Sequence, residues 1–144
     1  MIVKVKKLRE DAVIPVKAHP TDAGFDITAV EWKCDEDGNI VYKTGLAFEI
    51  PEGYAGFLFP RSSVAKKDQM LSNCVGVVDC HYRGEVLFKY KMIAPIKHDE
   101  YHIYKAGERV GQMIILPIPA VEMLESDDLN ETDRGVGGYG STGK

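Results

Sequence analysis

Short apolar runs that recur at roughly ten-residue intervals constrain the fold of this chain more than any other feature. Each run is rich in Val, Ile, Phe and Tyr, and clusters of Gly, Pro and Asp separate one run from the next. Residues of these types favour strands, and repeated strands without intervening helices are typical of all-β barrels and sandwiches. We expect strands at residues 2–6, 25–29, 31–34, 40–42, 45–50, 54–59, 74–78, 85–90 and 110–117, and a weaker one at 121–124.

Two local signals add detail to this all-β pattern. Residues 35–39, Asp-Glu-Asp-Gly-Asn, form a hairpin-type turn between the strands expected at 31–34 and 40–42. Residues 62–70 are the one stretch with a helical pattern, and Ser62 or Ser63 is expected to cap it. The sequence therefore predicts one short helix in an otherwise β fold.

The composition fits one domain that spans residues 1–144. A net charge of −4 disfavours nucleic acid and anionic membranes as general partners. No apolar run approaches the ~20 residues of a membrane span, and the start of the chain, where Lys alternates with Ile and Val, does not have the pattern of a signal peptide. We therefore expect a cytoplasmic protein.

The stretch from Arg134 to Gly143 carries five glycines, one Arg, one Tyr and two hydroxyl residues. Glycine loses much backbone entropy on ordering, so such a run favours ligand binding over a place in a packed core. Glycine N–H groups, the Arg134 guanidinium and the hydroxyls can all hold phosphate, and Tyr139 can stack on a ring. We expect residues 125–144 to form a mobile C-terminal arm that closes over a nucleotide; a plain linker is the alternative.

Two further segments combine charge with an exposed backbone. Asp26 stands between apolar residues directly after a turn, where it could bind a ligand or accept hydrogen bonds from backbone N–H groups. Arg61, Ser62 and Ser63 end an apolar strand and begin the expected helix. Exposed N–H groups at a helix start, with an Arg and two hydroxyls, favour an anion site, although an N-cap beside a surface Arg is the simpler reading.

Asp79 and Gln112 mark the other two candidate segments. Asp79 ends the apolar strand at 74–78 and begins a Cys-His-Tyr-Arg-Gly turn, so it could act as a general base or simply as a turn former. Gln112 lies inside an apolar run, where a buried amide needs hydrogen-bond partners. It could contact a ligand or the backbone.

Taken in order, these segments resemble the five motifs of the homotrimeric deoxyuridine triphosphatase (dUTPase) family. The motifs are Ala-Gly-Phe-Asp at 23–26, Pro-Arg-Ser-Ser at 60–63, Gly-Val-Val-Asp-x-x-Tyr-Arg-Gly-Glu at 76–85, Gly-Glu-Arg-Val-Gly-Gln at 107–112 and the glycine-rich run at 134–143. The resemblance implies a jelly-roll-like β-barrel of the β-clip type and a homotrimer with shared active sites. It also implies Mg²⁺-assisted hydrolysis of dUTP to dUMP and pyrophosphate, which limits uracil in DNA and supplies dUMP for dTMP synthesis.

The resemblance assigns the catalytic roles residue by residue. Asp79 would orient and deprotonate the attacking water, and Asp26 would hold Mg²⁺ through the water shell of the ion. The triphosphate itself would supply most of the ligands to the metal. Its own protein contacts would come from Arg61, Ser62, Ser63 and Gln112.

The base, the sugar and the γ-phosphate would be bound by other motifs. Asn73 would contact uracil together with the backbone of Gly76 and Val78, and Tyr82 would pack beneath the deoxyribose. Tyr139 of the arm would stack over uracil. The arm would contact the phosphates through Arg134, Gly138, Gly140, Ser141 and Thr142.

Some positions depart from the commonest family pattern, and two other functions stay open. Cys80 and His81 replace a frequent Ser-Asp pair, and Gly111 replaces a frequent Ala. His81 beside Asp79 could give unusual pH dependence, which a pH–rate profile of His81→Asn would test. The rivals are a dCTP deaminase-like relative, which would release ammonia from dCTP, and a nucleotide-dependent regulatory binding protein.

Overall fold

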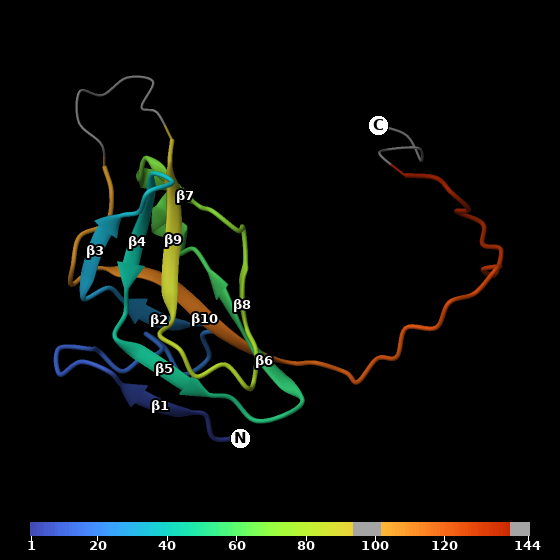
Figure 1. The fold of residues 1–144 in the computed structure, drawn as a ribbon, viewed down its shortest axis with the longest axis horizontal. Helices are drawn as coiled ribbons and strands as arrows, with labels where there is room; N and C mark the ends of the chain where they lie inside the picture. The colour runs from blue at the N-terminus through green and yellow to red at the C-terminus, as the bar shows by residue number, and fades with distance from the viewer. Residues whose placement is uncertain (94–101, 139–144) are drawn as a thin grey trace.

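The computed structural model describes residues 1–93 and 102–138, and this part of the chain is almost entirely β (Figure 1). The single helical element is a short 3-10 helix, η1 (Ser62–Lys66). None of the helical structure in these residues is long and apolar enough to cross a membrane. The strands are β1 (Lys4–Lys7), β2 (Phe25–Thr28), β3 (Glu31–Cys34), β4 (Asn39–Lys43), β5 (Leu46–Glu49), β6 (Tyr54–Phe59), β7 (Gln69–Leu71), β8 (Gly76–Val78), β9 (Leu87–Met92) and β10 (Arg109–Pro117).

These strands form three antiparallel sheets with a jelly-roll-like arrangement. One sheet has the order β2-β10-β6-β8, a second has β3-β4-β9-β7, and β1 pairs with β5. The sheets do not close into a continuous barrel within the described residues. Strand β10 is the longest and pairs with both β2 and β6, so it fixes the relative register of the segments on either side of it.

The core follows from the two-residue alternation of the strands. In β9, Phe88 and Tyr90 are buried while their neighbours Leu87 and Lys89 are exposed, as expected of a strand with one face on the core. Strand β4 brings Ile40 and Tyr42 to the same interior. Removing these large apolar side chains from water contributes about 1.5–3 kcal/mol for each.

Gly111 in β10 makes room for one of these core side chains. A Cβ added at Gly111 would lie 2.0 Å from Cε1 of Phe88, and Phe88 is only 1% exposed. The glycine at position 111 is therefore matched to the aromatic ring packed against it.

We expect Gly111→Ala to destabilise the protein, because neither the ring nor the strand can move freely. Overpacking of this kind costs roughly 1–3 kcal/mol, which corresponds to a fall in Tm of about 3–10 °C for a domain of this size. Thermal unfolding measures the effect. The double variant Gly111→Ala with Phe88→Leu should recover part of the loss, and an unchanged Tm in the single variant would contradict the packing argument.

Most of the expected strands are present, with ends shifted by at most two residues. The hairpin at 35–39 is confirmed: the Asp35 carboxylate accepts hydrogen bonds from the backbone N–H groups of Asp37 and Asn39, and Gly38 has a φ of 75°. The helix expected over 62–70 is wrong in extent, because β7 begins at Gln69 and pairs with β9. Its N-cap is Arg61, whose side chain makes no capping bond, so neither Ser62 nor Ser63 has that role. The weak strand expected at 121–124 does not form among the described residues.

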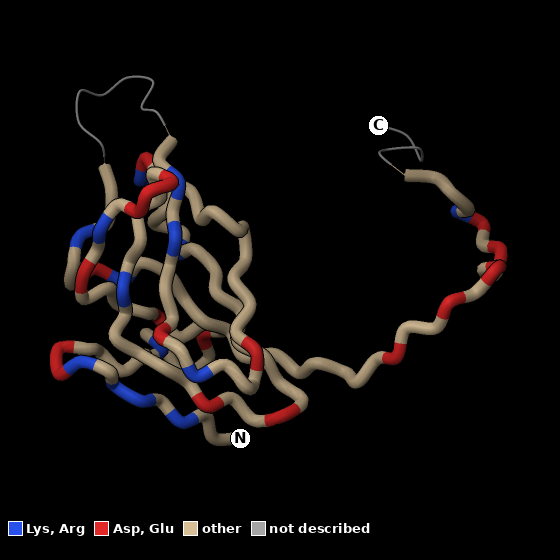
Figure 2. Tube along the Cα trace, viewed as in Figure 1, with Lys and Arg blue, Asp and Glu red and all other residues tan. Residues whose placement is uncertain are grey.

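After β10 the chain leaves the folded body as an extended segment, residues 118–138, drawn in orange to red in Figure 1. Its apolar side chains Val121, Met123, Leu124 and Leu129 are exposed. Six acidic residues and no basic one lie between residues 118 and 133 (Figure 2).

Candidate active site

The first part of the site is a carboxylate held between two guanidinium groups. Asp26 of β2 accepts a hydrogen bond from Nε of Arg61 at 2.7 Å and another from Nη1 of Arg109 at 2.9 Å. The Asp26 side chain is only 15% exposed, whereas that of Arg109 is 52% exposed. With two positive groups for one negative group, this cluster keeps a net positive charge that suits an anion.

Strand pairing explains how these groups meet. In β10, Gln112 lies opposite Asp26 of β2 and, on its other side, opposite Phe59 at the end of β6. An irregularity in the β2 pairing between Arg109 and Gly111 changes the register at that point. Such bulges re-aim side chains, and here the result is that Arg109 contacts Asp26.

Gln112 belongs to the same cluster and is fixed on two sides. Its Nε2 donates a hydrogen bond to the carbonyl oxygen of Pro60 at 3.1 Å, directly before Arg61. A Cβ built on Gly24 would lie 2.3 Å from Oε1 of Gln112. The absence of a side chain at Gly24 therefore leaves room for the Gln112 amide. The hydrogen bond to Pro60 is the kind of partner that an amide inside an apolar run needs.

We expect Gly24→Ala to impair function through Gln112, because the added methyl displaces the amide from the anion cluster. Loss of one positioned hydrogen-bonding group corresponds to about a tenfold fall in kcat/KM. Steady-state kinetics checks this. In a Gln112→Ala background the Gly24→Ala change should have little further effect; a full second loss there would show that Gly24 acts by another route.

The second part of the site is a cavity of about 340 Å³ beside strand β8. Apolar groups from β6, β7 and β9 form its walls, among them Leu58, Leu71 and Phe88. It is lined by five of the residues that the resemblance assigns to the base, the sugar and the water: Asn73, Gly76, Val78, Asp79 and Tyr82.

Close packing shapes this cavity. Gly76 faces Leu58 across the β6–β8 pair, and a Cβ there would lie 3.1 Å from the Leu58 side chain. The Tyr82 ring lies over Gly84, where a Cβ would meet its hydroxyl at 2.4 Å, and that hydroxyl donates to the carbonyl oxygen of Glu85 at 3.0 Å. Strand β8 forms the edge of its sheet, so one side of its backbone is free of strand pairing in the described structure.

Asp79 and His81 are both open to solvent. The Asp79 side chain is exposed, and its carbonyl oxygen accepts a hydrogen bond from the Tyr82 N–H at 3.0 Å, which closes the turn after β8. The His81 side chain is 79% exposed and lies 4.0 Å from the Glu52 carboxylate. A water molecule can therefore reach the Asp79 carboxylate.

The structure separates the expected site residues of one chain into three places. Asp26, Arg61 and Gln112 form the anion cluster, with Ser62 exposed next to them and Ser63 bonded to Tyr104. None of them is among the described residues that line the cavity. Arg134 and Gly138 lie on the extended segment, where Nε of Arg134 donates to the Gly137 carbonyl oxygen. Tyr139, Gly140, Ser141 and Thr142 lie outside the described residues.

Arg109 belongs to the anion cluster, although the motif-by-motif reading did not select it. It was part of the fourth motif, but only the register of β10 against β2 shows its contact with Asp26. A basic residue two positions before a strand glycine, at the start of the strand that carries Gln112, was the available signal.

The acidic groups of the described residues do not form a ready-made metal cage. No group of three or more His, Cys, Asp or Glu side chains there is arranged to hold an ion. Asp26 offers one hard carboxylate at the anion cluster. This donor set suits an ion such as Mg²⁺ that keeps several waters and is bound mainly by substrate phosphates.

An anion cluster and a small polar-edged cavity on a jelly-roll-like scaffold define a nucleotide-binding protein. The model of the dUTPase family matches residues 10–143, and the chain belongs to this family.

Relatives match over nearly the full chain. The deoxyuridine 5'-triphosphate nucleotidohydrolase of Hydrogenobaculum sp. (strain Y04AAS1) is 40% identical over 146 residues, which cover 99% of each chain. That of Arabidopsis thaliana is 41% identical over 144 residues, 97% of this chain and 82% of the relative.

Solved structures agree with this. A mutant dUTPase of Staphylococcus bacteriophage 80alpha with dUpNHpp has a TM-score of 0.83 at 30% identity and covers 99% of both chains. A mutant dUTPase of S. aureus phage phi11, which coordinates a structural Mg(II) ion, has a TM-score of 0.74 at 28% identity and covers 89% of this chain and 98% of that one.

Proposed function

We propose that this chain hydrolyses dUTP to dUMP and pyrophosphate, with the groups that bind and activate the substrate assigned as follows. One observation carries the proposal: the cavity beside β8 brings Asn73, Gly76, Val78 and Tyr82 together with the exposed carboxylate of Asp79. A pocket for base and sugar with a carboxylate at its rim suits attack by water on a phosphate attached to that sugar.

The base is read by an edge strand. Uracil has an acceptor, a donor and an acceptor in a row along one edge. Strand β8 has one unpaired side, and its backbone N–H and C=O groups there can bind the base as they would bind a neighbouring strand. Asn73 completes this edge with its amide. The close walls around Gly76 oppose a C5 methyl group, and Tyr82, held against Gly84, opposes a ribose 2′-hydroxyl.

Asp79 takes the proton of the attacking water. The water oxygen forms a bond to the α-phosphorus, the bond from that phosphorus to the bridging oxygen breaks, and pyrophosphate leaves. A carboxylate is an intrinsically weak base, so its contribution lies mostly in orientation. General-base help of this kind is worth about 10²–10⁴-fold.

The triphosphate lies against the anion cluster. Arg61, Ser62 and Gln112 hold its oxygens, and Asp26 fixes the direction of the Arg61 guanidinium with a 2.7 Å hydrogen bond. When bound, Mg²⁺ supplies neutralising charge to the phosphate oxygens. Asp26 is the residue that would hold the water shell of the ion.

A homotrimer with shared sites accounts for the separation of the three parts in one chain. Residues 125–144 form the arm of a single domain, 1–144, and reach a neighbouring subunit instead of folding back. There Arg134, Gly138, Gly140, Ser141 and Thr142 close on the phosphates, and Tyr139 covers the base. A cytoplasmic enzyme of net charge −4 with no general affinity for nucleic acid or membranes fits this role.

Pyrophosphate release from dUTP, dCTP, dTTP and UTP tests the function. Each substrate is assayed with Mg²⁺ and again with excess chelator. We expect metal-dependent release from dUTP alone. Ammonia released from dCTP would instead identify a deaminase, and binding of dUpNHpp without any turnover would identify a nucleotide-dependent binding protein.

A further inference from the structure

Ser63 makes its hydrogen bond toward the core, unlike its neighbour Ser62. Oγ of Ser63 lies 3.0 Å from the hydroxyl of Tyr104, a residue that is 2% exposed, whereas Ser62 is exposed. The two serines of the second motif therefore have different environments. Ser62 is open to a ligand, and the Ser63 hydroxyl already has a partner in the protein.

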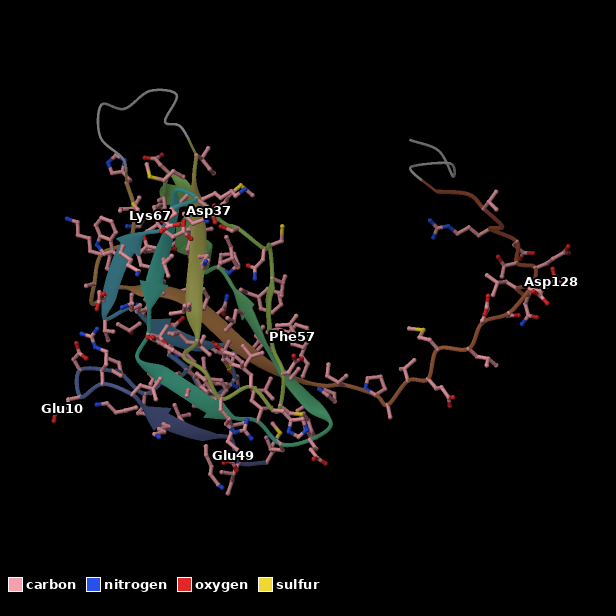
Figure 3. The ribbon with its side chains drawn as sticks, viewed as in Figure 1. Glu10, Asp37, Glu49, Phe57, Lys67 and Asp128 are labelled. Carbon is pink, nitrogen blue, oxygen red and sulfur yellow. The ribbon has the colours of Figure 1, made fainter. Side chains whose placement is uncertain are left out.

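A second contact ties the other end of η1 to the same segment. Nζ of Lys67, labelled in Figure 3, donates to the carbonyl oxygen of Ile103 at 3.1 Å and lies 4.8 Å from the centroid of the Tyr104 ring. A five-residue 3-10 helix has little stability of its own, and η1 has no side-chain N-cap. Its position therefore depends on the segment that carries Tyr104.

Tyr104 is in turn fixed by the core. The hydroxyl of Tyr42 lies 3.2 Å from the Tyr104 carbonyl oxygen and donates to Oε1 of Gln69 at 2.8 Å. The rings of Tyr42, Tyr90 and Tyr104 meet edge to face, with centroids 5.6–6.1 Å apart. Burial raises the pKa of Tyr42 to about 12, so its hydroxyl remains a hydrogen-bond donor at neutral pH. Packed aromatic rings give Tyr104 one orientation.

We propose that Tyr104 is a positioning residue for catalysis: through Ser63 it holds the turn that presents Arg61 and Ser62 to the triphosphate. Asp26 orients the Arg61 guanidinium from one side, and Tyr104 fixes the backbone of the same turn from the other. This role rests on the proposed function for its effect on turnover. In this proposal the Ser63 hydroxyl binds Tyr104, whereas the motif resemblance implied that it binds the triphosphate directly.

Tyr104→Phe removes the hydroxyl and keeps the ring. We expect kcat for dUTP to fall about tenfold with a smaller change in KM, because small displacements of a positioned group weaken the transition state most. Tyr90→Phe is the matched control, since it removes another buried hydroxyl of the cluster, bonded to the Val110 carbonyl oxygen at 2.6 Å. Val110 is fully buried in the core, and its packing there holds it in place, so this control should lower Tm but leave kcat within about twofold. Equal kcat losses in the two variants would overturn the proposal.

A double-mutant cycle separates positioning from direct contact. If Ser63 acts through Tyr104, Ser63→Ala and Tyr104→Phe remove the same hydrogen bond, and the double variant should be no slower than the slower single variant. If the two losses multiply, Ser63 contacts substrate independently, and the positioning role assigned to Tyr104 is wrong.

Hydrogen exchange gives a measure that does not depend on turnover. We expect amides of residues 62–67 to exchange faster in Tyr104→Phe than in Tyr90→Phe, since only the first variant releases η1. If the wild-type protein does not hydrolyse dUTP, the proposed function fails, and exchange still tests the tether. Unchanged exchange at 62–67 in Tyr104→Phe would overturn the tether itself.

Discussion

Asp79→Asn should lower the turnover of dUTP by about 10²–10⁴-fold. The amide has the shape of the carboxylate but cannot take the proton of water. Because the Asp79 side chain is exposed and only its backbone closes the turn, neither the cavity nor the stability should change. Single-turnover and steady-state rates measure the loss, and titration with dUpNHpp shows whether binding is kept.

Asp37→Asn is the matched control for this variant. Asp37 is an exposed acid at the hairpin between β3 and β4, labelled in Figure 3, and has no assigned part in the site. Its loss should leave turnover within about twofold of wild type, as is usual for surface substitutions. Turnover of Asp79→Asn close to that of Asp37→Asn would remove Asp79 as the base and require another group to activate water.

Truncation after Asp133 has the second large expected effect. It deletes the donors of residues 134–143 and should reduce turnover by about 10²-fold or more, because closure over the substrate both positions the phosphates and excludes water. The core should be unaffected, since it lies entirely within residues 12–113. An unchanged Tm with normal turnover would make the glycine-rich run a linker after all.

Mixing two inactive variants tests where the arm acts. The truncated chain keeps Asp79 and lacks the arm, while Asp79→Asn keeps the arm and lacks the base. If the arm reaches a neighbouring subunit, mixed oligomers contain sites with both parts, and activity should return after the two proteins are unfolded and refolded together. An arm that closes on its own subunit would give no such recovery.

Much of the fold could be predicted because its strands are continuous apolar runs. Strand β6 has the predicted bounds, and β10 differs by one residue at its start. The helix predicted over 62–70 failed at Gln69 because pairing of that residue with Met92 of β9 outweighs local helical preference. A single sequence does not reveal such a long-range pair.

In the site, too, features that are local in the sequence could be predicted and long-range contacts could not. Motif order identified every residue assigned to the cavity beside β8, because these positions are close together in the sequence. The contact of Arg109 with Asp26 spans 83 residues and that of Ser63 with Tyr104 spans 41, so each depends on strand register. The roles of the individual residues stay predictions until the variants are measured.

The five acids between residues 125 and 133 make the arm a short polyelectrolyte. Like charges repel one another and extend such a chain at low ionic strength, while at about 0.15 M salt the screening length falls to ~8 Å and the chain can contract. Arg134, the first cation after this stretch, thus lies at the far end of an acidic segment that shortens as the salt concentration rises. If the arm closes over the substrate, ionic strength should change the rate of closure separately from the affinity for the phosphates.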